Sequence, residues 1–350
     1  MLTALTEQLQ RGESLTPALV VSAVAELTAE NITADIKADF LTALARKGES
    51  VAELAAFAAE LREQAIALPL DAATRAREIL DVVGTGGDQL GTFNISTTVA
   101  ILCAAAGVTV AKHGNRAVTS QVGSADVVEA LGMKVDLTPA EAARALRDHN
   151  FVFLFAPNYH PAFKHIGPAR KLCAARGQRT IFNLLGPLLN PVRPSAQLLG
   201  VPRAELCEPM ARVLQTLGMR RGMVVSGTIT AGESPAANLD ELSTLGGNTV
   251  AEFYQERGFA VSQFLPEQFP LQPATLADLR GGDKLANAEI IRRVLGGAER
   301  GPKRDAVLLN AAAALFVAGR TKSLVAGWEL AAETIDGGAA ARKLAALCEV

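Results

Sequence analysis

The stretch ILDVVGTGGD, residues 79–88, decides the fold. Its first five residues are mostly apolar and β-branched, which predicts a short buried strand. The glycines that follow at once predict a turn whose backbone N–H groups come close to an anionic ligand, because no Cβ stands in the way. The pattern is neither a Walker loop nor the dinucleotide motif GxGxxG. An ordinary tight strand–helix turn is the competing interpretation of this segment on its own.

Similar apolar runs recur along the chain and predict further strands. A helix signature begins near Ser96, and a capped helix begins at Thr138-Pro139. The predicted strands after the first cover residues 108–111, 151–155, 197–201, 223–226, 249–253 and 259–264. Strand–helix alternation followed by closely spaced strands indicates an α/β domain with a central mixed, mainly parallel sheet. The small and polar residues 227–237 predict an exposed loop.

The amino-terminal part has only helix signals. Thr16-Pro17 and Thr33 are helix starts, and Ser50 with Glu53 forms a capping box. We therefore predict a small all-helical domain over residues 1–72, joined by helices from about 168–192, and a large α/β domain over residues 73–350.

Composition narrows the function classes. The 350 residues are 49% hydrophobic and 20% charged, which excludes wholesale disorder. The formal net charge of −2 gives no global basic field, so we expect neither a nucleic acid nor a membrane as partner. No signal peptide or membrane-spanning run is evident. Four scattered cysteines without a close pair are typical of reduced thiols, so we expect a cytoplasmic protein.

Two polar segments follow predicted strands and suit an anion. Asn94-Ile95-Ser96-Thr97 opens a helix, where free N–H groups bind phosphate, although helix capping alone also explains these residue types. The segment KHGNRAVTS, residues 112–120, offers two cations, an amide and two hydroxyls after an apolar strand. A charge run is often only a solvated surface. At the carboxyl edge of an α/β sheet, however, it predicts a cradle for a phosphate ester.

A pair of adjacent carboxylates forms the fourth candidate segment. Asp240 and Glu241 lie between leucines, where a solvated turn is the plain interpretation. Beside a polyphosphate site they become candidate ligands for Mg²⁺, which prefers one or two carboxylates plus phosphate oxygens and waters. His160 and His165 have the wrong spacing for a helical zinc site. His113 is interpreted as a neutral histidine without a role in proton transfer.

Taken together, the motifs resemble one family. They are GTGGD (84–88), NIST (94–97), KHGNRAVTS (112–120), GSADVVEALG (123–132), FLFAPNYHPAFKH (153–165), RTIFNLLGPLLNP (179–191) and LDELS (239–243). In this order and spacing they resemble the anthranilate phosphoribosyltransferases. The resemblance implies a homodimer that transfers phosphoribose from 5-phosphoribosyl 1-diphosphate (PRPP) to the amine of anthranilate, the second step of tryptophan biosynthesis from chorismate.

The resemblance also implies roles for individual residues. Lys112 and Arg116 are the electrostatic candidates for stabilising the leaving diphosphate, without a certain catalytic residue. The anthranilate carboxylate is expected at Arg170, with Asn115 and Gly84 near the aromatic acid. Two Mg²⁺ ions per monomer are expected at Ser96, Asp240 and Glu241. The PRPP-binding residues implied are Gly84, Gly87, Asp88, Thr92, Asn94, Ile95, Ser96, Thr97, Lys112, His113, Gly114, Asn115, Arg116, Ala117, Val118, Thr119, Ser120 and Ser124.

Two departures and two alternatives accompany the resemblance. Gln121-Val122 differs from the polar residues more usual there, and the stretch between Ser226 and Leu239 is longer than the family's turn. A pyrimidine nucleoside phosphorylase shares the implied fold, but the GPAR setting of Arg170 speaks against it. A non-catalytic relative that binds nucleic acid through a basic groove is disfavoured by the net charge.

Overall fold

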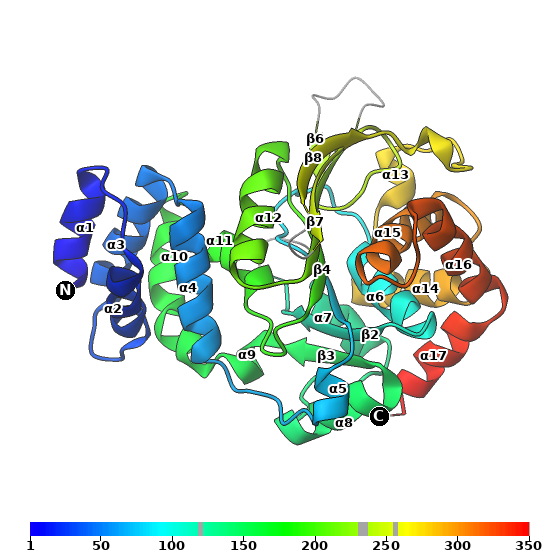
Figure 1. Cartoon of the computed structure of the whole chain (residues 1–350), viewed down its shortest axis with the longest axis horizontal. Helices are drawn as coiled ribbons and strands as arrows, with labels where there is room; N and C mark the ends of the chain where they lie inside the picture. The colour runs from blue at the N-terminus through cyan, green and yellow to red at the C-terminus, as the bar shows by residue number, and fades with distance from the viewer. Residues whose placement is uncertain (118–121, 230–236, 255–257, 350) are drawn as a thin grey trace.

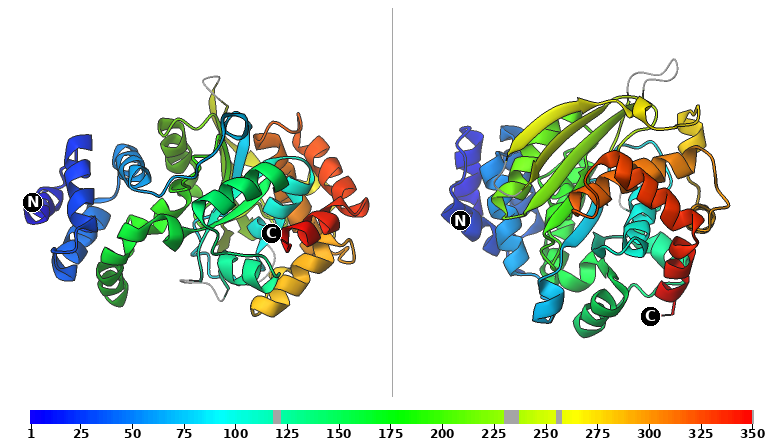
Figure 2. Two further views of the ribbon diagram at one scale, coloured as in Figure 1. Left: turned by 90° about the horizontal axis from the view of Figure 1, so that it is seen from below. Right: turned by 45° about the vertical axis from the view of Figure 1, so that its right-hand side comes forward.

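The chain folds into a helical amino-terminal part and a larger part built around one sheet (Figure 1). The computed structural model describes residues 1–117, 122–229, 237–254 and 258–349. In this part of the chain, none of the helices combines the length and the hydropathy needed to cross a bilayer. The two further views place the helical amino-terminal part at one end of the molecule and the last helices at the other (Figure 2).

Four helices open the chain: α1 (Leu2–Gln10), α2 (Pro17–Thr28), α3 (Ala34–Lys47) and α4 (Val51–Glu63). The predicted starts are present, since the Thr16 hydroxyl accepts from Leu19 N and Ser50 with Glu53 forms both halves of a capping box. Thr33 stands at the start of α3 but its side chain makes no capping hydrogen bond. Leucines, alanines and two phenylalanines of these helices form their shared core.

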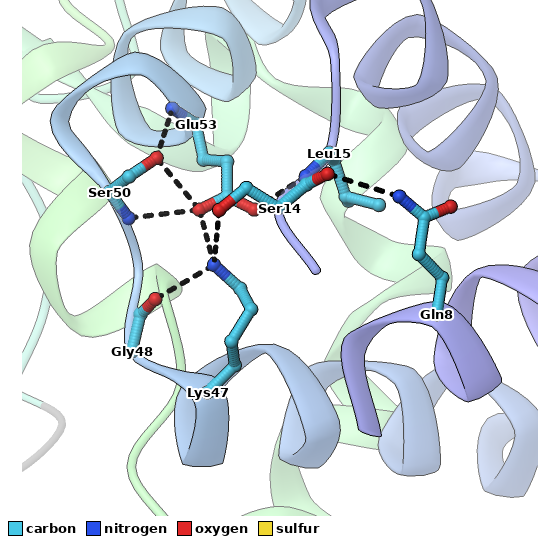
Figure 3. Close-up of polar contacts among 7 residues, drawn as sticks. All are labelled: Gln8, Ser14, Leu15, Lys47, Gly48, Ser50 and Glu53. Carbon is cyan, nitrogen blue, oxygen red and sulfur yellow. Dashed lines mark hydrogen bonds and ion pairs between the residues drawn. The ribbon is translucent and has the colours of Figure 1, made fainter. Parts of the chain in front are cut away.

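A buried ion pair ties the linkers of this helical part together (Figure 3). Lys47 Nζ lies 2.7 Å from Glu53 Oε2, and the two side chains are 6% and 0% exposed. Glu53 also accepts from Leu15 N at 2.9 Å and from Ser50 N at 2.9 Å. Lys47 Nζ donates to the Gly48 carbonyl as well. The pair therefore fixes the α1–α2 linker against the α3–α4 linker.

Two later helices join the amino-terminal ones. α10 (Gly167–Ala175) packs against α3, and α11 (Phe182–Leu185) packs against α4. Ile166, Ala169 and Cys173 belong to the same apolar core as α1–α4. Figure 1 shows α10 in green among the blue amino-terminal helices. A segment far along the sequence thus completes the helical part.

The sheet has the strand order β3-β2-β1-β4-β5-β7-β8, with β6 paired to β5. The pairs from β3 to β5 are parallel, whereas β7 and β8 extend the sheet antiparallel, so the predicted mixed, mainly parallel sheet is confirmed. The strand bounds are β1 (Ile79–Gly84), β2 (Thr109–Gly114), β3 (Phe151–Phe155), β4 (Ala196–Gly200), β5 (Arg221–Ile229), β6 (Ala237–Leu239), β7 (Asn248–Tyr254) and β8 (Phe259–Phe264).

Helices cover both faces of this sheet (Figure 1). On one side, α6 packs on β1 and β2 and against the nearly fully buried, alanine-rich α15. On the other side, α12 packs on β5 and β7 and contacts α4, which joins the helical part to the sheet. The remaining helices have the bounds α5 (Ala72–Arg75), α6 (Ile95–Ala105), α7 (Ser124–Ala130), α8 (Pro139–His149), α9 (Ala156–Tyr159), α12 (Cys207–Thr216), α13 (Leu276–Leu279), α14 (Lys284–Leu295), α15 (Pro302–Val317), α16 (Leu324–Asp336) and α17 (Ala339–Leu347).

The predicted loop over residues 227–237 is wrong at both ends. Residues 227–229 extend β5, and Ala237 begins β6, which pairs with β5 antiparallel. Gly227 pairs with Leu239 and Thr228 with Asn238 in this hairpin. The sequence pattern did not predict this hairpin, because its small and polar residues are held by backbone pairing rather than by burial of apolar side chains. The positions between the two strands lie outside the described residues.

Candidate active site

The carboxyl ends of β1, β2 and β4 meet at one edge of the sheet, because the three strands are parallel neighbours. β1 and β4 end at Gly84 and Gly200, which are register partners, and β2 ends at Gly114. The segment that follows β6 returns across this edge and brings Asp240 and Glu241 onto it. Four of the segments singled out in the sequence therefore come together in space.

Glycine is required where the returning segment crosses. A Cβ at Gly84 would overlap the Asp240 carboxylate, and a Cβ at Gly200 would overlap the Asp240 carbonyl oxygen. The loop after β1 also turns through positive φ values of 71° at Gly86 and 90° at Gly87. Gly86 N donates to Asp240 Oδ2 at 2.7 Å. The glycine-rich turn thus holds one of the two predicted metal ligands by its backbone.

The amino terminus of α6 points its free N–H groups at the same place. Ser96 N donates to Glu241 Oε1 at 3.2 Å. Asn94 does not cap the helix, since its side chain instead bonds to Val122 O at 3.5 Å and accepts from Asn287 Nδ2 at 3.0 Å. The alternative in which Asn94 merely caps α6 is therefore wrong. Without that cap, the helix end attracts negative charge, here a carboxylate.

Lys112 is the buried cation of the site. Its side chain is 1% exposed, and Nζ donates to the Val82 carbonyl and to Ser96 Oγ, at 3.2 Å for the hydroxyl. Burial lowers the pKa of Lys112, while the negative charges of Asp81 and Glu241 oppose that shift. Lys112 therefore links strand β2 to the start of α6, which also binds Glu241.

The carboxylates crowd one another. Burial, together with the neighbouring charge of Asp88, raises the pKa of Asp240 to about 7. Burial and the charge of Asp240 raise the pKa of Glu241 well above its ordinary value, with Lys112 opposing. Asp88 Oδ2 is buried without a hydrogen-bond donor among the residues that the structure describes. Oxygen ligands whose negative charge lacks compensation fit a hard divalent cation such as Mg²⁺.

The metal candidates do not form a closed cage. In the described ranges, no three side chains of His, Cys, Asp or Glu are arranged to hold a metal ion by themselves. Mg²⁺ commonly combines one or two carboxylates with substrate phosphate oxygens and waters. Asp240 and Glu241, with the Ser96 hydroxyl beside them, match that more open kind of site.

The cradle segment after β2 is only partly described. Asn115 is exposed, its side chain accepts from Arg116 N at 2.8 Å, and its carbonyl accepts from Ser124 Oγ at 3.3 Å. Ala117 N donates to Asp126 Oδ2 at 3.2 Å. The predicted ligands Val118, Thr119 and Ser120, like Gln121, lie outside the described residues.

Arg116 is exposed and already paired. Its Nη1 lies 2.9 Å from Asp126 Oδ1 and 3.0 Å from Glu129 Oε2, both on α7, and its guanidinium lies 5.5 Å from the Phe155 ring centroid. These carboxylates raise the pKa of Arg116 above its ordinary range. The structure thus pairs this predicted electrostatic residue, which follows β2, with two carboxylates of α7 rather than with Asp240 or Glu241.

The other predicted PRPP-binding residues differ in whether their side chains or only their backbone groups are accessible. Ile95 is 2% exposed and belongs to the apolar core, so only its backbone is available. Thr97 is also buried, and its hydroxyl has no hydrogen-bond partner among the described residues. Thr92 pairs in an isolated bridge with Arg280. Thr92 therefore lies at the far end of the glycine-rich loop.

Arg170 is a half-buried cation on α10. Its guanidinium lies 5.4 Å from the ring centroid of Phe182 on α11. Burial lowers the pKa of Arg170. Its side chain makes no hydrogen bond or ion pair within the described parts of the chain. Such a guanidinium is ready to take up a planar carboxylate.

A row of rings connects this arginine with strand β2, and the sequence did not point to it. His113 packs edge-on against His160, with centroids 5.3 Å apart, and His160 stacks on Phe163 at 5.1 Å. Phe163 in turn contacts Phe182. Burial lowers the pKa of His113 to about 3 and that of His160 to about 4. The prediction that His113 is neutral agrees with this shift.

Two supporting residues were also missed. Asn310 on α15 accepts from Leu242 N at 2.9 Å and donates to the Leu242 carbonyl at 2.9 Å, which fixes the residue after Glu241. Asn248 accepts from Ser243 N at 2.7 Å. A buried polar residue that opens the alanine run at 310–315 was the available signal for Asn310.

Comparison with known proteins decides the family. A model described as "Glycosyl transferase family, a/b domain" matches residues 76–341, and "Glycosyl transferase family, helical bundle domain" matches residues 3–65. An anthranilate phosphoribosyltransferase of Lacticaseibacillus casei is 48% identical over 307 residues, covering 88% of this chain and 85% of the relative. The chain belongs to the anthranilate phosphoribosyltransferase family. The resemblance stated from the motifs is confirmed.

Solved structures of anthranilate phosphoribosyltransferases have the same fold. The enzyme from Thermus thermophilus superposes with a TM-score of 0.86 at 40% identity, over 99% of each chain. The enzyme from Saccharomyces cerevisiae, solved in complex with PRPP and Mg, gives a TM-score of 0.84 at 27% identity, over 99% of this chain and 97% of that one. The predicted small helical part with a larger α/β part is confirmed by this likeness.

Proposed function

We propose that this chain transfers the phosphoribosyl group of PRPP to the amine of anthranilate, giving N-(5-phosphoribosyl)anthranilate and diphosphate in tryptophan biosynthesis. The observation that carries the proposal is that Glu241 binds the uncapped end of α6, and Asp240 the glycine-rich turn, close to buried Lys112. Family membership and the yeast relative's complex with PRPP and Mg support it.

The donor binds along the carboxyl edge of the sheet. The backbone of the glycine-rich turn and the N–H groups of α6 bind phosphate oxygens, since such groups favour negative charge. The Lys112 ammonium, already within reach of Ser96, adds a positive charge in a buried setting where it is weakly screened. Arg116 joins the cradle by leaving Asp126 and Glu129 for the substrate.

Asp240, Glu241 and the Ser96 hydroxyl would hold magnesium, and we propose two ions per chain. When bound, Mg²⁺ stabilises negative charge on the departing diphosphate. Burial raises the pKa values of Asp240 and Glu241, which means that their negative charges are unfavourable in this setting. A bound cation would offset that cost. The yeast relative solved with PRPP and Mg supports the choice of metal.

The acceptor is oriented rather than deprotonated by the chain. Arg170 binds the anthranilate carboxylate through its planar fork, with Asn115 and Gly84 near the ring. An aromatic amine is a neutral nucleophile near pH 7, so the step needs positioning against C1 of the ribose more than a general base. His113 and His160 stay neutral because burial lowers their pKa values, and their rings lie between the donor-binding residues and Arg170.

The assembly and location of the protein complete the proposal. A homodimer in the cytoplasm fits the family resemblance and the scattered free thiols, three of which are buried. Size-exclusion chromatography with light scattering tests the dimer.

Product analysis tests the reaction itself. Purified protein is incubated with PRPP, Mg²⁺ and anthranilate, and the mixture is analysed by mass spectrometry. The proposal predicts N-(5-phosphoribosyl)anthranilate and an equal amount of diphosphate. A parallel incubation with thymidine and inorganic phosphate tests the phosphorylase alternative. Base release in that incubation, without an anthranilate adduct in the first, would overturn the proposal.

A further inference from the structure

The segment from Gly186 to Asn190, here called the connecting segment, joins the acceptor side to the sheet. It follows α11, whose Phe182 lies under Arg170, and leads toward β4. Two of its carbonyls are held by buried side chains of different elements: Pro187 O accepts from Gln197 Nε2 at 2.9 Å, and Leu188 O accepts from Arg62 Nε of α4. Its placement therefore sets where Arg170 stands relative to the strands.

Asn190 ends the connecting segment and is fully buried. Its Nδ2 donates to Asp81 Oδ2 at 2.9 Å and to the Ala111 carbonyl at 2.7 Å, while its Oδ1 accepts from Val192 N at 3.0 Å. Both amide hydrogens are thus used, one on β1 and the other on β2. One side chain ties the connecting segment to the two strands that carry the donor site.

Asp81 is the other half of this link. It is 0% exposed on β1, three residues before Gly84, and its Oδ1 accepts from His113 N at 3.4 Å. A buried carboxylate lowers stability unless its bonds compensate for lost hydration, and burial here raises the pKa of Asp81 to about 6. An apolar residue would serve packing alone at lower cost in free energy. The Asp81 charge opposes the lowering of the Lys112 pKa, and the same carboxylate also accepts from Asn190, which joins β1 to the connecting segment.

We propose that Asp81 and Asn190 are a positioning pair that fixes the acceptor arginine, Arg170, in register with the donor cradle on β2. The inference rests on the proposed function. The pair touches neither substrate, and it acts through the connecting segment and α11. Because a displacement of about 1 Å can lower a rate by about 100-fold, a link of this kind controls turnover more than binding.

Three substitutions, Asn190→Ala, Asp81→Asn and Asp81→Ala, separate the hydrogen-bonded link from the negative charge of Asp81. Asn190→Ala removes the bonds to both strands, and Asp81→Asn keeps an oxygen that accepts from Asn190 while losing the negative charge. Asp305→Asn is the matched control, because Asp305 is a buried carboxylate on α15 that accepts from Gln272 N at 2.9 Å. Each variant is assayed for kcat, for KM of anthranilate, and for PRPP affinity by calorimetry with Mg²⁺.

For Asn190→Ala we expect kcat/KM for anthranilate to fall by roughly 10- to 100-fold, with PRPP affinity within about threefold of wild type. Asp81→Asn should retain clearly more of the wild-type kcat/KM for anthranilate than Asp81→Ala, which should lose about as much as Asn190→Ala. The same loss in Asp305→Asn, or wild-type kinetics in both Asn190→Ala and Asp81→Ala, would overturn the inference. Should Asn190→Ala not fold, the contrast between Asp81→Asn and Asp81→Ala decides.

The two proposals fail in different ways. Wild-type protein that yields no N-(5-phosphoribosyl)anthranilate refutes the proposed function. Wild-type turnover with unaffected positioning variants refutes only the link through Asp81 and Asn190.

Discussion

Replacing Arg170 by alanine isolates the acceptor side of the site. Because the guanidinium makes no ion pair among the described residues and only stacks near Phe182, its removal should cost the fold about 1 kcal/mol or less. A charge-assisted, forked hydrogen bond to a carboxylate contributes about 3 kcal/mol. We therefore expect the KM for anthranilate to rise by about 100-fold, since 1.4 kcal/mol corresponds to a factor of ten.

The assay follows initial rates by the loss of anthranilate fluorescence at saturating PRPP and Mg²⁺. Affinity for PRPP, measured by calorimetry, should stay within about twofold of wild type, because the donor contacts lie on other elements. Lys171→Ala is the matched control: it removes the same charge from an exposed neighbour on α10. An equal rise in KM in Lys171→Ala, or a matching loss of PRPP affinity in Arg170→Ala, would refute the reasoning.

Three further predictions concern other parts of the structure. Gly200→Ala should lower kcat/KM for PRPP by at least about 100-fold in steady-state assays, because the new Cβ displaces Asp240; wild-type kinetics would contradict this. Glu53→Gln should lower the free energy of unfolding in urea by about 3 kcal/mol, because it leaves Lys47 buried without its counter-charge, and a loss under 1 kcal/mol would be too small. The raised pKa of Asp81 means that the folded chain binds a proton more readily than the unfolded chain, so this group's contribution to stability falls as pH rises from about 4 to about 6. The gap in unfolding free energy between wild type and Asp81→Asn should therefore change by up to about 3 kcal/mol between pH 4 and 7, and a constant gap in urea titrations at the two pH values would contradict this.

Apolar patterning predicted the sheet well, both for the buried strand β3 and for β8, whose sequence is apolar although most of its residues are exposed. The runs at 151–155 and 259–264 match β3 and β8 residue for residue. β6 escaped because its three residues pair with β5 through the backbone. Patterning also did not predict that the elements between β8 and Leu347 are all helices joined by loops. A strand held by pairing alone leaves little trace in side-chain hydropathy.

The candidate site was predictable where residue type alone dictates the chemistry. The glycines after β1 and the start of α6 lie together with Asp240 and Glu241, which the segment after the antiparallel strand β6 brings to the same edge. The pairing of Arg116 could not be predicted in this way, because a run of charged residues does not show that Asp126 and Glu129 of α7 lie beside its guanidinium.

Long-range contacts explain the residues that were not foreseen. The link from Asp81 to Asn190 joins residues 109 positions apart, and the contact of Asn310 with Leu242 spans 68. Gly200 is required by the Asp240 carbonyl that crosses it. Such requirements arise only once β1, β4 and the segment after β6 are folded together.

Transfer to anthranilate is tested most simply by following anthranilate fluorescence after purified protein, PRPP and Mg²⁺ are mixed. We expect a steady loss of fluorescence that stops when EDTA is added and resumes with excess Mg²⁺. Unchanged fluorescence while calorimetry shows PRPP bound would contradict the assignment of anthranilate as acceptor. A fluorescence loss insensitive to EDTA would contradict the role given to Asp240 and Glu241.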